Sequence, residues 1–298
     1  MGTFGQTEHD VTSLFPAGKE FSYDGHKYRV LVSGKPKPPR GECKTDAYIK
    51  AVDENKRIRE FKISIKQTNA EFLENKMSLE RAKEIFGDDA QAIIKQSISP
   101  IANNFKNDYL IHVQQGHHTE AKTIRLGWKF ELLRNDGGRR AGSIILTREQ
   151  KLNVYAGTAL NDSKKNCWVN GEIINNSGVA NMYVEVEPGE NDIETVLADM
   201  IPIEDFVDSN NSDLCFACKA LNYRAVPDKW DGDRPLAVYV DWKLQGGKMK
   251  GTVVMDHPLE HQGNEIGENV RAILKQLKID ASNFESIKKI VSADTKVF

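Results

Sequence analysis

Long hydrophobic runs, a secretory signal and a disulfide-rich composition are all missing from this chain of 298 residues. Its residues are 39% hydrophobic and 28% charged, which is typical of a globular protein, and no apolar run is long enough to cross a bilayer. The first residues include Glu8, His9 and Asp10 and lack a basic segment followed by an apolar one. We therefore predict a cytoplasmic protein without contact to a membrane.

Cysteine is scarce as well. The four cysteines are too few and too widely spaced for a disulfide framework, which favours reduced thiols. Cys215 and Cys218 have the spacing of a zinc knuckle, and His257 with His261 would complete a Cys₂His₂ site. Because the residues around the two cysteines are apolar, buried thiols are the simpler interpretation, and zinc binding stays open.

An excess of positive charge is also absent, since the net charge is −2 and the pI about 6.4. This argues against a protein that is basic over its whole surface, but it allows a local basic cleft. Four basic residues do gather just before Asp46, in a segment that three prolines make stiff and extended. They are Lys35, Lys37, Arg40 and Lys44.

Alternating apolar and polar residues, together with turn signals, predict a mixed α+β protein. Hairpins are expected at 21–32, 123–146 and 235–255, with turns at Asp24-Gly25, Asp136-Gly137-Gly138 and Gly246-Gly247. Helices are expected at 78–87, 88–98, 263–277 and 282–291 and after the capping box of Thr147 and Gln150, with a short strand at 108–113.

The most informative pattern is a further hairpin, formed by strands at 45–49 and 60–67. On the second strand Glu60, Lys62, Ser64 and Lys66 alternate with Phe61, Ile63 and Ile65, which predicts one polar and one apolar face. With a loop of three or five residues Asp46 faces Lys62 or Ser64, and Asp46, Glu60 and Lys62 are expected to converge. A loop of four residues would turn Asp46 away.

Two acids and an amine at one point are suited to hold Mg²⁺ beside a phosphodiester and to activate a water molecule. Glu42, Lys66 and Gln67 are possible additional residues of such a site. The pattern of Asp46 followed by Glu60-Phe61-Lys62 resembles the PD-(D/E)xK nuclease superfamily, with Thr45 in place of the proline.

This resemblance implies a restriction-endonuclease-like core, in which a mixed β-sheet is flanked by helices, with additional antiparallel hairpins and C-terminal helices. It implies that Asp46 and Glu60 bind Mg²⁺ and that Lys62 is essential for cleavage. Residues 1–120 would form the catalytic core, and residues 121–298 would serve DNA recognition and dimerisation, either packed on the core or in one domain with it.

The predicted function is that of a sequence-specific, Mg²⁺-dependent endonuclease for double-stranded DNA, most similar to a type II restriction enzyme and acting as a homodimer. The residues expected to contact DNA are Lys35, Lys37, Arg40, Lys44, Arg139 and Arg140. Two alternatives stay open: a repair or recombination nuclease on the same core, and a DNA-binding protein without catalytic activity.

The tripeptide alone is a weak signal, because an acid two residues before a lysine occurs nine times in the chain. Asp241-Trp242-Lys243 is a rival site on another expected strand. The segment from His257 to His261 matches the His-x-x-Glu-His pattern of inverted zinc peptidases, but Pro258 and Gly263 leave too little helix for that site.

Overall fold

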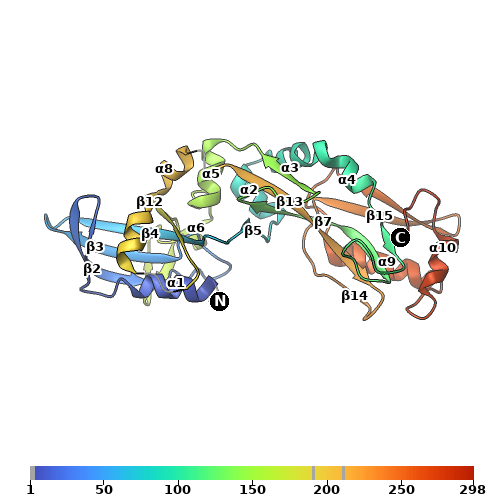
Figure 1. The fold of residues 1–298 in the computed structure, drawn as a ribbon, viewed down its shortest axis with the longest axis horizontal. Helices are drawn as coiled ribbons and strands as arrows, with labels where there is room; N and C mark the ends of the chain where they lie inside the picture. The colour runs from blue at the N-terminus through green and yellow to red at the C-terminus, as the bar shows by residue number, and fades with distance from the viewer. Residues whose placement is uncertain (1–3, 190–191, 210–211) are drawn as a thin grey trace. The chain divides into compact units, whose positions relative to one another are not determined.

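A computed structural model describes residues 4–189, 192–209 and 212–298. The chain divides into two compact units, each built from two separate segments (Figure 1). Residues 1–71 and 146–212 form the first unit, and residues 72–145 and 213–298 form the second. Both contain a β-sheet with helices, so the protein belongs to the mixed α+β class that the sequence predicts.

The first unit is organised around a sheet with the strand order β1-β2-β3-β4-β11-β12, in which β4 and β11 are parallel and the other neighbours antiparallel. Its strands are β1 (Glu20–Tyr23), β2 (His26–Gly34), β3 (Ala47–Asp53), β4 (Ile58–Gln67), β11 (Met182–Val186) and β12 (Ile201–Pro202), with the separate pair β9 (Cys167–Val169) and β10 (Glu172–Ile174). Its helices are α1 (Phe4–Ser13), α5 (Arg148–Tyr155), α6 (Asp162–Lys165), α7 (Ile193–Asp199) and α8 (Ile203–Asp208).

One face of this sheet forms the main core of the first unit. The alternation in β4 turns Phe61, Ile63 and Ile65 toward that core, where α1 contacts β3 and β4 through its buried residues Thr7 and Val11. Each of these β4 side chains is at most 5% exposed, and burying one contributes roughly 1.5–3 kcal/mol. The polar residues of β4 consequently lie on the opposite face.

Aromatic side chains cover part of that opposite face. Tyr183 of β11 stacks on Phe206 of α8, with 4.1 Å between the ring centroids, and both rings contact Tyr155 of α5 edge to face. This packing fixes α5 and α8 over β11. The candidate site lies at the C-terminal end of β4, around Lys66.

The second unit contains a sheet with the path β14-β13-β7-β15-β16, with β5 and β6 paired to β7 and β8 paired to β13. Its strands are β5 (Phe72–Glu74), β6 (Ile111–His112), β7 (Thr123–Leu133), β8 (Ala141–Ile144), β13 (Leu214–Arg224), β14 (Lys229–Trp230), β15 (Val238–Gln245) and β16 (Lys248–Val254). Its helical segments are α2 (Leu79–Phe86), α3 (Ala90–Ile98), η1 (Ser99–Ile101), α4 (Ala102–Lys106), α9 (Gly263–Gln276), η3 (Phe284–Ser286) and α10 (Ile287–Ile290).

Several local predictions are confirmed. The hairpins β1–β2 and β15–β16 form with the expected turns, and Ser78 and Gly87 cap α2. The side chain of Thr147 accepts a hydrogen bond from the backbone of Gln150 in the predicted capping box of α5. These features depend on neighbours in sequence, which is why the pattern predicts them well.

The predicted hairpin at 123–146 is wrong. β7 and β8 do not pair with each other, because β13 lies between them and pairs with both. The turn residues Asp136-Gly137-Gly138 indicate where the chain reverses, but they do not identify the strand that completes the sheet. The helix expected at 282–291 is also shorter and is divided into η3 and α10.

The sequence predicts a catalytic role for residues 1–120 and a recognition role for residues 121–298, and this division of roles stays a prediction. The two compact units are not divided at residue 120, since residues 146–212 belong to the first unit together with the N-terminal segment. In particular, β11 pairs with β4.

Candidate active site

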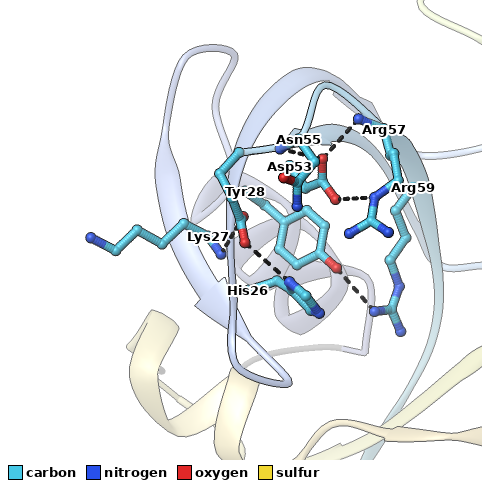
Figure 2. Close-up of polar contacts among 8 residues, drawn as sticks. His26, Lys27, Tyr28, Asp53, Asn55, Arg57 and Arg59 are labelled. Atoms are coloured by element: carbon cyan, nitrogen blue, oxygen red, sulfur yellow. Dashed lines mark hydrogen bonds and ion pairs between the residues drawn. The ribbon is translucent and has the colours of Figure 1, made fainter.

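The β3–β4 hairpin has a loop of three residues, one of the lengths for which Asp46 was expected to face β4. Asp53 donates its backbone N–H to the carbonyl of Arg57 at 2.9 Å, and Lys56 takes up a positive φ of 64°. Figure 2 shows the Asp53 carboxylate accepting bonds from the backbone of Asn55 (2.8 Å) and from the backbone and side chain of Arg57 (2.7 and 2.8 Å). These bonds hold the loop length and so fix the register of the two strands.

That register brings Asp46 beside the segment from Ile63 to Lys66. Ala47 pairs with Ile63, and the backbone N–H of Asp46 bonds to the Ile63 carbonyl at 2.8 Å. The Asp46 carboxylate accepts the backbone N–H of Ile65 at 2.8 Å, and its Oδ2 lies 3.8 Å from Lys66 Nζ. The Asp46 side chain, which is 15% exposed, therefore accepts a backbone hydrogen bond of β4 just before β3 begins, where a backbone carbonyl of a neighbouring strand would otherwise accept it.

Glu60 and Lys62 lie further along β4. Glu60 pairs with Lys50 and Lys62 with Tyr48, so Glu60 is four residues from Ser64, or about 13 Å along the strand. Glu60 accepts a 2.6 Å hydrogen bond from the hydroxyl of Tyr48. The structure therefore does not bring the carboxylates of Asp46 and Glu60 together, and the expected convergence of three side chains is not observed.

The amine of Lys62 is engaged elsewhere. Lys62 Nζ donates to the carbonyl of Asn176 at 3.2 Å, and burial lowers the pKa of this amine. The side chain of Asn181 holds the adjacent backbone, accepting from Lys62 N at 2.8 Å and donating to Glu60 O at 2.9 Å. The Glu60-Phe61-Lys62 tripeptide is thus tied to the segment 176–181.

A second carboxylate comes from helix α1. The buried side chain of Gln67 donates to Thr7 at 2.6 Å, which fixes the register of α1 against β4. The next residue, Glu8, forms an ion pair with Lys35 at the end of β2. Burial, and then the negative charge of Asp46, raise the pKa of Glu8, while Lys35 and Lys66 lower it.

Glu8 was not predicted from the sequence. Thr7 and Val11, four residues apart, mark the buried side of α1, and Glu8 directly follows Thr7. The spacing shows a helix face, but nothing in it says which strand end that face covers. A surface hollow of about 440 Å³ is lined by both Glu8 and Lys35, so the pair borders open space.

β11 adds a third acid to the surroundings of Lys66. Glu185 pairs with Lys66 in the parallel register, so both side chains point to the same face of the sheet. The Glu185 carboxylate accepts a 2.9 Å hydrogen bond from Tyr183. In residues 4–189, 192–209 and 212–298, no three His, Cys, Asp or Glu side chains come close enough to form a metal site by themselves.

The other residues predicted to contact DNA divide between the two units. Lys35, Lys37, Arg40 and Lys44 lie on the segment that leads to Asp46, and Glu42 is exposed on the same segment. Arg139 is exposed in the second unit. Its neighbour Arg140 forms a 2.6 Å ion pair with Asp108 and covers the ring of Trp128, so this guanidinium has a structural role.

The rival sites are not supported by the geometry. Asp241 is paired with Lys243 at 2.6 Å, but the residues that face them on β16 are Thr252 and Lys250, so the partner strand supplies no second acid there. Cys215 and Cys218 are three residues apart in one regular stretch of β13, so their side chains lie on opposite faces of the sheet and cannot share an ion. The four cysteines are free thiols.

The chain matches no protein-family model, no curated protein and no solved structure. In the described part of the chain, no helix is both long and apolar enough to cross a membrane.

Proposed function

We propose that this protein is a Mg²⁺-dependent endonuclease that cuts double-stranded DNA on a core of the restriction-endonuclease type. The single observation that carries the proposal is the group at the end of the sheet, where the Asp46 carboxylate lies 3.8 Å from the Lys66 amine. Glu8 of α1 adds a second carboxylate, whose pKa is raised by burial and then by the charge of Asp46. Two acids and an amine at one point are the equipment that the resemblance requires, although two of the three residues differ from the predicted set.

Mg²⁺ fits this donor set. Asp46 and Glu8 offer hard oxygen ligands, which pair with Lys66 and Lys35, and a cation held by both carboxylates would add to the positive charge that balances them. Mg²⁺ is usually held by one or two carboxylates together with waters and substrate phosphates, so a third protein ligand is not needed. When bound, the ion supplies a Lewis acid for the phosphate and lowers the pKa of bound water.

Lys66 is proposed as the lysine of the motif in place of Lys62. Its amine would orient the attacking water or stabilise negative charge on the phosphate. Hydrolysis joins the oxygen of that water to phosphorus and breaks one P–O bond, and the leaving oxygen takes up a proton. Ser64, which is 1% exposed, stands where the resemblance expects the acid, and Glu8 supplies the missing carboxylate from the helix.

Double-stranded DNA is the proposed substrate because the segment that leads to Asp46 is basic, with Lys35, Lys37, Arg40 and Lys44 as candidate phosphate contacts. Sequence specificity, a homodimer, and a role of the residues after 120 in recognition remain part of the proposal. Cleavage at one short sequence would distinguish a restriction enzyme from a repair or recombination nuclease on the same core.

The test is incubation of supercoiled plasmid with the purified protein and Mg²⁺, beside the variant Asp46→Asn. The asparagine oxygen still accepts the N–H of Ile65, so the variant keeps the fold but loses a charged ligand. We expect cleavage by the wild type, none in EDTA, and a rate at least about 100-fold lower for the variant, with DNA binding retained.

An Asp46→Asn variant that cuts as fast as the wild type would overturn the proposed site. A wild-type protein that binds plasmid but never cuts it would favour the DNA-binding protein without catalytic activity.

A further inference from the structure

A small two-stranded ribbon beside the candidate site exposes apolar side chains. β9 and β10 pair through the turn Asn170-Gly171, and Ile173 lies directly opposite Trp168. The alternate residues of β9, Cys167 and Val169, are at most 1% exposed, so that side of the ribbon faces the protein. Trp168 and Ile173 are 46% and 59% exposed and form a pair on the outer side.

Lys37 extends this pair into a row. Its backbone N–H donates to the Trp168 carbonyl at 2.9 Å, and the Trp168 N–H donates back to Lys37 at 3.0 Å. Residues that exchange both hydrogen bonds point their side chains to the same face. The side chains of Lys37, Trp168 and Ile173 therefore lie side by side, in what we name the Trp168 row.

The surroundings of the Trp168 row are basic. The row lies on the segments 35–44 and 161–174, and together these two segments carry six basic and three acidic side chains. They are connected by backbone hydrogen bonds, since Gly178 accepts from Lys44 N at 3.0 Å and donates to Lys165 O at 2.8 Å. Among the described residues, the side chains of Lys37, Arg40 and Lys165 form no ion pair with an acid, so their charges are available to a ligand.

The same segment connects the row to the proposed catalytic group. Lys35, two residues before Lys37, pairs with Glu8, and the segment ends at Asp46. The Asn170 side chain also donates to the carbonyl of Ser33 at 2.8 Å, which fixes the ribbon to the end of β2. The row is thus held firmly near the point where a phosphodiester would be cut.

We propose that the Trp168 row contacts the bases of duplex DNA, with Trp168 and Ile173 inserted into a groove and Lys37 on the flanking phosphates. This inference rests on the proposed function. Two apolar side chains are too small a patch for a stable protein interface, whereas an exposed indole among unpaired basic groups suits flat bases within a polyanion. The row would therefore help to determine which DNA sequence is presented to Asp46.

The test measures the affinity of a labelled DNA duplex without Mg²⁺, so that hydrolysis does not enter. We expect Trp168→Ala to bind roughly tenfold more weakly than the wild type. Ile58→Ala is the control, because Ile58 is an exposed isoleucine (53%) of the same unit at the turn of the β3–β4 hairpin, and it should bind within about twofold of the wild type.

A second readout uses the fluorescence of tryptophan. Trp128 and Trp242 are at most 1% exposed, so quenching of the protein by DNA should come from Trp168 or from the partly exposed Trp230, and the inference assigns it to Trp168. We expect the quenching to disappear in Trp168→Phe and to persist in Trp230→Phe, while both variants keep the thermal stability of the wild type.

Unchanged affinity of Trp168→Ala together with quenching that persists in Trp168→Phe would overturn the inference, and so would a wild type that binds no duplex. The nuclease proposal fails separately, through cleavage that does not depend on Asp46. A loss of affinity in Trp168→Ala beside such a result would support the DNA contact and reject only the catalytic site.

Discussion

Strand β4 carries two lysines on the same face, Lys62 and Lys66, and they lie in different environments. Lys62 stands two residues after the acid Glu60, donates to the backbone carbonyl of Asn176 and lies over the middle of the hairpin. Lys66 stands two residues after Ser64, but it lies 3.8 Å from Asp46 and beside Glu185 at the end of the strand. The tripeptide with the better match to the motif has the poorer surroundings for metal-dependent hydrolysis.

The register of the two strands, and not the tripeptide, determines which side chains of β4 lie beside Asp46. A loop of three residues at the hairpin turn brings Asp46 to Ser64 and leaves Glu60 four residues away. An acid supplied by α1 can compensate for the missing acid on the strand, because α1 is fixed there by the bond between Thr7 and Gln67.

The largest effect should separate the two lysines. We expect Lys66→Ala to reduce the rate of plasmid cleavage by roughly 100-fold or more, since the group that orients water or stabilises charge is lost. Lys62→Ala, the matched control on the same strand, should stay within about threefold of the wild type. The measurement is the rate of plasmid conversion at saturating Mg²⁺, with melting temperatures of both variants as a check on folding.

A reversed order, with cleavage lost in Lys62→Ala and retained in Lys66→Ala, would return the active site to the Glu60-Phe61-Lys62 tripeptide. Equal and large losses of cleavage in the two variants would contradict the assignment of Lys66 alone as the catalytic lysine.

A smaller effect should mark Glu8 as a metal ligand. We expect Glu8→Gln to raise the Mg²⁺ concentration needed for half-maximal cleavage by at least about tenfold, because one charged oxygen ligand is removed. Asp10→Asn is the control on the same helix, since Asp10 bonds to Gln6 and belongs to no described group around Asp46. A Mg²⁺ titration of the cleavage rate measures both.

The pH dependence sharpens the same prediction. Burial and the charge of Asp46 raise the pKa of Glu8, so its carboxyl stays protonated to a higher pH than an ordinary glutamate. The apparent affinity for Mg²⁺ should therefore fall as the pH drops through this raised pKa, and Glu8→Gln should weaken that dependence. An equally steep profile in the variant would contradict the role of Glu8.

The smallest effect concerns Tyr48 and Glu60. We expect Tyr48→Phe to lower the free energy of unfolding by about 1 kcal/mol, because a 2.6 Å hydrogen bond in a buried part of the sheet is lost. Cleavage should be unchanged if Glu60 has a structural role. Chemical denaturation and the plasmid assay measure the two quantities, and a loss of cleavage without a loss of stability would speak for a catalytic Glu60.

Much of the local structure could be predicted from the sequence. The polar and apolar faces of β4, the β1–β2 and β15–β16 hairpins and the capping box at Thr147 depend on residues close in the chain, and patterns of two or four residues are sufficient for them. The position of Asp46 beside the start of β3, next to a strand with one polar face, could be predicted for the same reason, while its role stays a prediction.

The long-range partners could not be predicted in this way. The parallel pairing of β4 with β11 places Ile63 opposite Met182. The position of Glu8 depends on the hydrogen bond between Thr7 and Gln67. Each of these depends on packing between segments far apart in sequence, which no local period encodes. For the same reason the sequence predicted β8 as the neighbour of β7, whereas β13 pairs with β7 in the structure.

The division of each unit into two segments has a consequence for the integrity of the protein. The chain passes between the units after residues 71, 145 and 212, so three covalent connections join them. A protease that cuts one connection leaves the two units linked through the other two. Ribosomal synthesis, by contrast, cannot finish the first sheet until β11 has emerged, long after the Asp46 strand, so a chain arrested at residue 145 carries neither complete sheet.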